Sequence, residues 1–473
     1  MVTKPRRLGA LMTSEPTTPL RDFLPPHRAA AIDEGAYPPM FASFFMAGFE
    51  ASSHRRKDRH RLDLIAATRH DVFALQDYRL CRAAGMNAIR DGLRWHLIER
   101  YRGLYDWSSW LPMLRAAREM GVQVIWDLFH YGRPDFIEIG APGFIDAFAQ
   151  FAAAAARVHR DEIDEPPIFC PFNEISFFAW AVDDGYFPPV KVQKSELKAE
   201  LVRIALAAVD AVRSVDRRAR FIWAEPLIHV APRHHGALEL RRAEDYRLAQ
   251  YQAYDMLTGR MRPELGGDPD CVDVVGLNFY PHNQWYYRGP TIPMGHHEYR
   301  SLATMLLEAH SRYGKPMLIS ETGAEGSGRP AWLHYVCDEV RQASALGAPI
   351  RGVCIYPVTA YLGWDNERHC DVGLFSNADD NGRREIYTPL LDELNRQLEA
   401  GVTAEQEALS RVQGEADYME LRFGPDALSV IEARLAAERG GRLPQASVTE
   451  AVRQKLLRRA ARHVAPLGPN SET

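Results

Sequence analysis

Eight short apolar segments lie between residues 41 and 400, and they constrain the fold more than any other feature of this sequence. They read FASFFMAG, NAIRDGL, VQVIWDLF, IFCPF, RFIWAE, DVVGLNFY, KPMLIS and IRGVCIY. Most of the intervals between them contain a stretch with the apolar spacing of a helix, such as FIDAFAQFAAAAARVH and ELVRIALAAVDAVRSV. Continuously apolar strands that alternate with helices indicate a parallel sheet that is covered on its outer face. Eight such units predict an α/β fold, the (β/α)8 TIM barrel.

An open, doubly wound sheet is the alternative arrangement of alternating strands and helices. A sheet of the dinucleotide-binding kind has a glycine-rich turn directly after its first strand. The stretch FMAGFEASSH, at the first predicted strand, lacks that pattern. The sequence therefore favours the closed barrel.

Two flanking segments differ from the barrel region. Residues 1–40 are rich in Pro, Thr and Arg and have no periodicity, so we expect a loose N-terminal arm. Residues 401–473 contain two charged stretches with helical character, TAEQEALSRVQGEADYMEL and VTEAVRQKLLRRAARHV. This C-terminal helical extension is either a solvated tail, or a lid or a contact between copies in a homo-oligomer. The predicted organisation is thus an arm, a barrel over 41–400 and a helical extension.

Composition excludes several classes of partner. Hydrophobic residues make up 46% and charged residues 25%, as in ordinary globular proteins, and the net charge is -5 with a pI near 6.4. We therefore expect no nucleic acid and no anionic membrane as partner. The six cysteines show neither a Cys-x-x-Cys pair nor zinc-like spacing. The N-terminus lacks the apolar stretch of a secretory signal, and no segment approaches the length of a membrane span, which predicts a cytoplasmic protein.

Polar residues stand where the predicted strands end. In a barrel of this type, the chemistry gathers at the C-terminal ends of the strands. The candidates there are Arg90, His130, Asn173, Glu174, Asn278, Tyr280 and Glu321, with Trp364 after the eighth strand. Structural alternatives exist: Arg90 could form an ion pair with Asp91, and His130 could be a core histidine.

Glu174 and Glu321 follow the fourth and seventh strands, and such a pair suits the cleavage of a glycosidic bond. In that reaction one carboxyl group donates a proton to the leaving oxygen, while the other is ionised and attacks the anomeric carbon. Arg90 and Tyr280 are suited to hold an ionised Glu321 by charge-assisted hydrogen bonds. Flat faces for a sugar ring could come from Trp95, Trp126, Trp285 and Trp364.

These motifs carry a resemblance to a known family. From about Phe41 to Leu391, the sequence resembles glycoside hydrolase family 1, and more broadly the retaining glycosidases with a (β/α)8 barrel. The stretches that resemble family motifs, in the family's order, are AAGMNAIR, DLFHYGRPD, PFNEIS, VVGLNFYP and LISETG. The resemblance implies a β-glucosidase-like or β-galactosidase-like hydrolase of O-glycosyl bonds that needs no cofactor, with a small-molecule or oligosaccharide glycoside as substrate. It implies Glu174 as acid/base and Glu321 as nucleophile, and it implies sugar contacts from Arg90, His130, Asn173 and Tyr280.

The sequence departs from the family pattern at three positions. Gly48 stands where the family has a sugar-binding Gln, Gly363 where it has a sugar-binding Glu, and Tyr356 where it has a Trp. From the two glycines we expect a wider and less polar sugar subsite that suits a substituted, deoxy or differently configured sugar. The lost hydrogen-bonding groups could be replaced by Glu50, His54, Asp365 or Glu367.

Three other functions stay open at this level. A transglycosylase would use the same glycosyl-enzyme intermediate, and the sequence does not rank it against a hydrolase. A non-catalytic sugar-binding barrel would keep the acids without turnover, which an assay with an aryl glycoside detects. A metal-dependent isomerase or aldolase would use clustered histidines, but HVAPRHH and the pair His296 and His297 lack the spacing of metal ligands, so we expect no metal.

Overall fold

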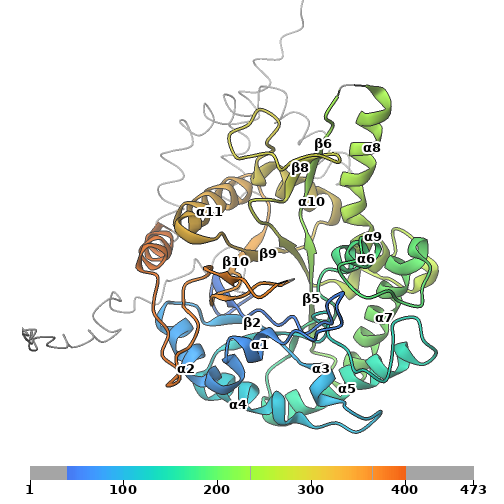
Figure 1. Ribbon diagram of the computed structural model, residues 1–473, viewed down its shortest axis with the longest axis vertical. Coiled ribbons are helices and arrows are strands. Elements are labelled where there is room, and N and C mark those ends of the chain that lie inside the picture. The colour runs from blue at the N-terminus through green and yellow to red at the C-terminus, as the bar shows by residue number, and fades with distance from the viewer. Residues whose placement is uncertain (1–39, 235, 365, 401–473) are drawn as a thin grey trace, which may run out of the picture.

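The computed structural model describes residues 40–234, 236–364 and 366–400. Eight parallel strands close into a barrel, in which neighbours follow the order of the chain and the last strand pairs with the first (Figure 1). The barrel strands are β1 (Phe45–Gly48), β2 (Ala88–Gly92), β3 (Gln123–Asp127), β4 (Ile168–Cys170), β5 (Arg220–Pro226), β7 (Val274–Asn278), β9 (Met317–Thr322) and β10 (Ile350–Ile355). The predicted (β/α)8 barrel is confirmed.

Helices surround the barrel on its outside (Figure 1). They are α1 (Leu64–Ala67), α2 (His70–Ala83), α3 (Trp95–Ile98), α4 (Leu111–Met120), α5 (Phe144–Glu162), α6 (Ile175–Asp183), α7 (Lys194–Val215), α8 (Ala237–Leu248), α9 (Gln252–Leu257), α10 (Leu302–Tyr313) and α11 (Arg329–Ala345), and residues 388–400 are also helical. Short two-stranded sheets pair β6 (His229–Ala231) with β8 (Gln284–Tyr286), and β11 (Tyr361–Leu362) with β12 (His369–Cys370).

Local sequence signals set several of the helix ends. The Asp63 side chain accepts a hydrogen bond from Ala66 N at the start of α1, and Ser301 does the same for Thr304 N at the start of α10. Helices α4 and α10 end at Gly121 and Gly314, which adopt left-handed φ values of 62° and 64°. Glycine adopts this conformation without steric cost, so each helix can stop there and return to the barrel.

The core has two layers because side chains alternate along each strand. Between the strands and the helices lies the larger apolar layer, which includes Ile89, Trp126, Phe169 and Trp223. A smaller cluster fills the inside of the barrel. Every barrel strand contributes to it, and β4 and β5 contribute two residues each: Met46, Ala88, Ile125, Ile168, Cys170, Ile222, Ala224, Val274, Leu318 and Cys354. This cluster closes the barrel interior with apolar side chains, so the polar residues of the interior are left to the C-terminal mouth.

A buried charged cluster supports β2 from its outer side. His70 Nε2 contacts Asp91 Oδ2 at 2.8 Å and its Nδ1 contacts Asp77 Oδ2 at 2.7 Å. Arg384 binds both carboxylate oxygens of Asp77 at 2.6 and 2.8 Å. Burial alone would lower the pKa of His70, but Asp91 and Asp77 raise it to about 9, so it is a cation at neutral pH. The cluster therefore contains two cations and two anions, and it fastens β2 and α2 to the segment that carries Arg384.

The predicted division into an arm, a barrel and a helical extension stays a prediction, since the structure describes little of the two flanking segments. All barrel strands and helices lie between residues 41 and 400, while the predicted arm (1–40) and the helical extension (401–473) fall almost wholly outside the described residues. Among the helices that the structure describes, none is long and apolar enough to cross a membrane.

Candidate active site

Seven of the eight predicted site residues meet in one hydrogen-bonded network at the C-terminal ends of the strands. Parallel strands of a barrel all end at the same mouth, so residues that are distant in sequence come together there. The seven are Arg90, His130, Asn173, Glu174, Asn278, Tyr280 and Glu321. The eighth, Trp364, lies at the edge of this network and is described below.

Glu321 lies on β9, where it is paired with Asn278 of the neighbouring strand β7. Hydrogen-bond donors occupy both of its carboxylate oxygens. Arg90 Nη1 donates to Oε1 at 2.7 Å, and Tyr280 Oη donates to Oε2 at 2.9 Å. The side chain is buried at 5% exposure. Burial raises the pKa of Glu321, and the Arg90 guanidinium opposes that rise. The arrangement suits a carboxylate that is held in one orientation and kept ionised by a buried cation.

Glu174 has a different environment. Its Oε2 accepts from Tyr131 Oη and its Oε1 accepts from Asn278 Nδ2, both at 2.9 Å. Burial, and next the negative charge of Glu321, raise the pKa of Glu174 to about 8. Because both neighbours donate to Glu174, a proton on this carboxyl is used in neither contact. Glu174 is also partly exposed, so at neutral pH it can present a proton to a molecule in the mouth of the barrel.

The backbone of Glu174 is held in a strained conformation at the start of α6. Its φ of 48° and ψ of 64° are left-handed, which costs a non-glycine residue on the order of 1 kcal/mol. Its amide donates to Ala224 O on β5 at 2.8 Å. Its side chain does not cap α6; instead Glu225, the next residue of β5, accepts from Ser176 N at 3.0 Å. Strand β5 thus fixes the backbone conformation of Glu174, and that conformation directs the Glu174 side chain into the site.

Glu225 was not among the residues predicted from the sequence. It is buried, and burial raises its pKa to about 7. Its position at the end of the segment RFIWAE was the available signal, because acids at strand ends are candidates in this fold. Because Glu225 accepts a hydrogen bond from the first turn of α6, it holds the helix start that follows Glu174. We therefore assign it a positioning role and not a direct role in the mouth.

Arg90 is buried at 2% exposure and connects three strands. Its Nε and Nη2 bind the two oxygens of Asp127 at 3.0 and 2.7 Å, and its Nη2 also donates to Asn173 Oδ1 at 2.6 Å. The alternative of an Arg90–Asp91 ion pair is wrong: adjacent residues of a strand point to opposite faces, and Asp91 binds His70 outside the barrel. Asp127 was missed, although it stands at the end of β3 within DLFH.

Both ring nitrogens of His130 form hydrogen bonds, which fix the orientation of the ring. Since Arg90 can only donate, the atom of Asn173 that faces it is an acceptor, and Asn173 Nδ2 must donate elsewhere. It donates to Tyr131 Oη at 2.8 Å and lies 3.1 Å from His130 Nε2. His130 Nδ1 donates to Asp127 Oδ2 at 2.9 Å.

Trp364 joins the site through a second chain of hydrogen bonds. Its Nε1 donates to Ser52 Oγ at 2.9 Å, and Ser52 Oγ donates to Glu50 Oε1 at 2.5 Å. The Trp364 ring packs against His54, with ring centroids 4.5 Å apart. Trp364 is partly exposed, so one part of its ring can face a bound molecule.

Two other tryptophans cannot contact a sugar. Trp95 and Trp126 are fully buried in the layer between strands and helices, so their proposed use as flat faces is wrong. Trp126 belongs to the outward-facing set of β3, since the inward-facing residue is its neighbour Ile125. Trp285 is partly buried on β8, outside the barrel sheet.

The expectation of a wider subsite is wrong at Gly48. A Cβ atom at Gly48 would collide with the ring of Tyr356, so this tyrosine fills the space beside the glycine. The departures at 48 and 356 are therefore one complementary change. A Cβ atom at Gly363 would collide with the Asn366 side chain.

The four residues that were expected to restore sugar contacts have different positions. Glu50 is buried at 7% exposure, and its Oε1 lies 3.5 Å from His130 Nε2. His54 is buried against Trp364. Glu367 is exposed to solvent, and Asp365 lies outside the described residues. Of the three that the structure describes, Glu50 is the one whose carboxylate lies within 4 Å of the predicted site residue His130.

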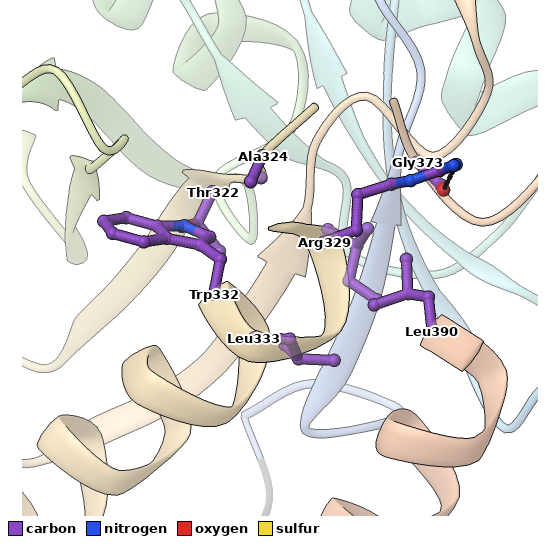
Figure 2. Close-up of a pocket in the computed structure, with 9 residues that line it drawn as sticks. Thr322, Ala324, Arg329, Trp332, Leu333, Gly373 and Leu390 are labelled. Carbon is purple, nitrogen blue, oxygen red and sulfur yellow. Dashed lines mark hydrogen bonds between the residues drawn. The ribbon is translucent and has the colours of Figure 1, made fainter. Parts of the chain in front are cut away.

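A small pocket lies beside the end of β9 and is separate from this network. Figure 2 shows Thr322, from the end of β9, facing Trp332 and Arg329 of α11, with Gly373 and Leu390 on the other side. Arg329 donates to Gly326 O at 2.8 Å and to Gly373 O at 2.9 Å, and Trp332 Nε1 donates to Thr322 Oγ1 at 2.9 Å. The pocket is a small gap between packed side chains, and the hydrogen bond from Trp332 to Thr322 holds the end of β9 against α11.

Two further observations concern metals and cysteines. In the parts of the chain that the structure describes, no group of three or more His, Cys, Asp or Glu side chains could hold a metal ion. The six cysteines are buried and are not joined in disulfides.

The structure is a (β/α)8 barrel in which two carboxyl groups, those of Glu174 and Glu321, belong to one hydrogen-bonded network at the C-terminal strand ends. No family model and no curated protein matches the sequence. Solved structures do match the fold. The β-glucosidase from Thermotoga maritima in complex with glucoimidazole has a TM-score of 0.62 at 12% identity, over 76% of this chain and 99% of its own. Virulence factor SghA from Agrobacterium tumefaciens has a TM-score of 0.61 at 16% identity, over 77% and 98%.

The chain therefore has the fold of the family 1 β-glucosidases and is divergent from them in sequence. A third example is the AHE enzyme from Alicyclobacillus herbarius, with a TM-score of 0.62 at 16% identity, over 77% of this chain and 99% of its own. At these identities the similarity establishes the barrel fold that was expected from the sequence.

Proposed function

We propose that this protein is a retaining β-glycoside hydrolase, similar to the β-glucosidases whose fold it shares. The observation that carries the proposal is the pair Glu174 and Glu321, in which one carboxyl holds a proton at neutral pH and the other is bound by Arg90. Retaining cleavage requires the two carboxyl groups about 5–5.5 Å apart, on either side of the bond. The influence of the Glu321 charge on the pKa of Glu174 supports that closeness.

The reaction proceeds in two displacements. Glu321 attacks the anomeric carbon while Glu174 donates its proton to the leaving oxygen, so the bond to the aglycone breaks as the bond to the Glu321 oxygen forms. Glu174, now ionised, takes a proton from water, which attacks the same carbon and releases Glu321. Two inversions give net retention. Arg90 and Tyr280 lower the cost of the negative charge that returns to Glu321 at the end of each cycle.

The first expected result is cleavage of aryl β-glycosides with retention of the anomeric configuration. Proton NMR of the sugar released in the first minutes is expected to show the β anomer, because each displacement inverts the carbon once. A panel of aryl β-glycosides that differ in the sugar measures activity and sugar preference in the same assay. Adding an alcohol as a competing acceptor measures how much of the intermediate is transferred and not hydrolysed.

Two outcomes would contradict the proposal. A first-formed α anomer would require an inverting reaction, which this pair does not serve. Binding of the sugars without any turnover on the whole panel would mean that the barrel binds sugars and does not cleave them.

The pH profile is expected to carry a limb that belongs to Glu174. The acid form of Glu174 is required for the first displacement, and its pKa of about 8 means that this form is present below that pH and is lost above it. We therefore expect kcat/KM on a nitrophenyl glycoside to fall about tenfold per pH unit above about pH 8. The matched measurement uses Glu174→Ala with a dinitrophenyl glycoside, which needs no protonation. An alkaline limb that persists unchanged in this variant would assign the titration to another group.

A further inference from the structure

Glu50 is a buried carboxylate in the sugar mouth that the two-carboxylate mechanism does not use. It lies two residues after the end of β1, and it is 7% exposed. After burial and nearer acids, its charge also contributes to the raised pKa of Tyr131 and of Tyr280. These tyrosines hold Glu174 and Glu321 respectively, so Glu50 faces the same mouth as the proposed catalytic pair.

The hydrogen bonds of Glu50 use only one of its oxygens. Its Oε1 accepts from Ser52 N at 3.0 Å and from Ser52 Oγ at 2.5 Å. Among hydrogen bonds between described residues, none reaches Oε2. Oε2 is not among the enclosed side-chain atoms that lack a partner, so it keeps contact with solvent and can accept a hydrogen bond from a bound molecule. The second oxygen of Glu50 is therefore a built acceptor without a protein donor.

The carboxylate of Glu50 also lacks a Lys or Arg partner among the described residues. In the described part of the chain, no Lys or Arg forms an ion pair with it, and the ionisable group in contact is His130, whose Nε2 lies 3.5 Å from Oε1. Asn173 Nδ2 lies 3.1 Å from that same Nε2, so Glu50 shares this atom with a second neighbour. The cation of the site, Arg90, is bound to Asp127 and Glu321. Buried charges in proteins are normally paired, and in the described part of the chain Glu50 has no Lys or Arg partner beside the 3.5 Å contact with His130.

A Gln side chain at this place would bind a ligand differently from the carboxylate of Glu50. A Gln side chain both donates and accepts, and it carries no charge, whereas a carboxylate only accepts. No side chain can extend from Gly48 because the Tyr356 ring occupies that space. The subsite thus has a charged acceptor at Glu50, which favours a positively charged donor on the bound sugar.

We propose that Glu50 binds a protonated amino group of the sugar, so that the preferred substrates are β-glycosides of amino sugars. The proposal rests on the proposed function for the identity of the site as a sugar subsite. The ammonium group would donate to Glu50 Oε2 and would neutralise its charge. Neutral sugars also bind, through a hydroxyl donor, but they lack the charge that completes the pair.

The test measures binding without chemistry. The ligands are 1,5-anhydroglucitol, which has no leaving group, and its derivatives in which one hydroxyl at a time is replaced by an amino group. Calorimetry below the pKa of the amine is expected to show that one amino derivative binds about 10- to 100-fold more tightly than the parent, as a charge-assisted hydrogen bond provides. Glu50→Gln is expected to remove that preference. Glu165→Gln, which alters an exposed acid just before β4, is the matched control and is expected to keep it.

The outcomes separate this inference from the proposed function. If no amino derivative binds more tightly than the parent, or if Glu50→Gln keeps the preference, the role of Glu50 is wrong even when aryl glycosides are cleaved. If Glu50→Gln weakens the parent and all derivatives equally, Glu50 binds a hydroxyl group and the amino sugar is overturned. If the preference depends on Glu50 and no glycoside is cleaved, the hydrolase proposal fails and the subsite assignment stands.

Discussion

Replacing Glu321 with alanine is expected to abolish turnover of every glycoside, whereas replacing Glu174 is expected to spare substrates with good leaving groups. Loss of a nucleophile removes the covalent route, and we expect kcat to fall by about 10⁴-fold or more. Glu174→Ala removes proton donation, which contributes about 10²–10⁴-fold on substrates with poor leaving groups. A dinitrophenol leaves without protonation, so its release in the first step is expected to change little.

The measurement is the pre-steady-state burst of dinitrophenol. Glu174→Ala is expected to show a normal burst followed by slow turnover, because the second step also needs Glu174 as a base. Adding azide, a nucleophile that requires no base, is expected to speed this second step. Glu165→Ala is the control for removal of an acid elsewhere, since Glu165 is exposed and precedes β4. Equal loss of the burst in the Glu174 and Glu321 variants would overturn the assignment of roles.

Replacing Arg90 with leucine is expected to cost both stability and activity. Arg90 is buried and binds both oxygens of Asp127 and one oxygen of Glu321. Removing one partner of a buried ion pair leaves uncompensated charge, which costs about 3–5 kcal/mol of the free energy of unfolding. Without the guanidinium, the pKa of Glu321 is expected to rise further, so less of the carboxylate is available for attack at neutral pH.

Urea unfolding and kcat measured on the same variants separate the two effects. Arg90→Leu combined with Asp127→Leu is expected to be more stable than Arg90→Leu alone, because the unpaired Asp127 is removed, but it is expected to stay inactive. Arg115→Leu is the matched control: Arg115 is 56% exposed and pairs with Glu162 on the surface, so its loss is expected to leave the free energy of unfolding nearly unchanged. A loss for Arg90→Leu as small as that of the control would show that the buried pair contributes little.

The sequence alone determined the barrel and most of the mouth. Strand and helix patterns depend on residues close in the chain, and eight alternations leave few ways to bury the apolar faces. Parallel strands of a barrel end at one mouth, so residues at strand ends, such as Arg90, Glu174 and Glu321, could be grouped before their contacts were known. The roles of these residues came from the resemblance to glycosidases and remain predictions.

Only the tertiary structure decided which side chains touch. Asp127 pairs with Arg90, and Glu225 supports α6, through contacts between strands that no local pattern encodes. Two tryptophans illustrate this. Trp126 points out of the barrel, because one step along a strand reverses the direction of a side chain, whereas Trp364 follows the last barrel strand and binds Ser52.

The space beside Gly48 also depends on residues that are distant in the sequence. From the sequence, Gly48 indicated empty space, since a glycine has no side chain to fill it. In the folded chain the ring of Tyr356, which is 308 residues later by number (356 − 48), occupies that space, and Glu50 supplies the charge beside His130. Space in a protein interior is set by all neighbours at close-packed density, and barrel closure brings β1 and β10 together. That closure, and not the residue at position 48, determines the space at this end of the barrel.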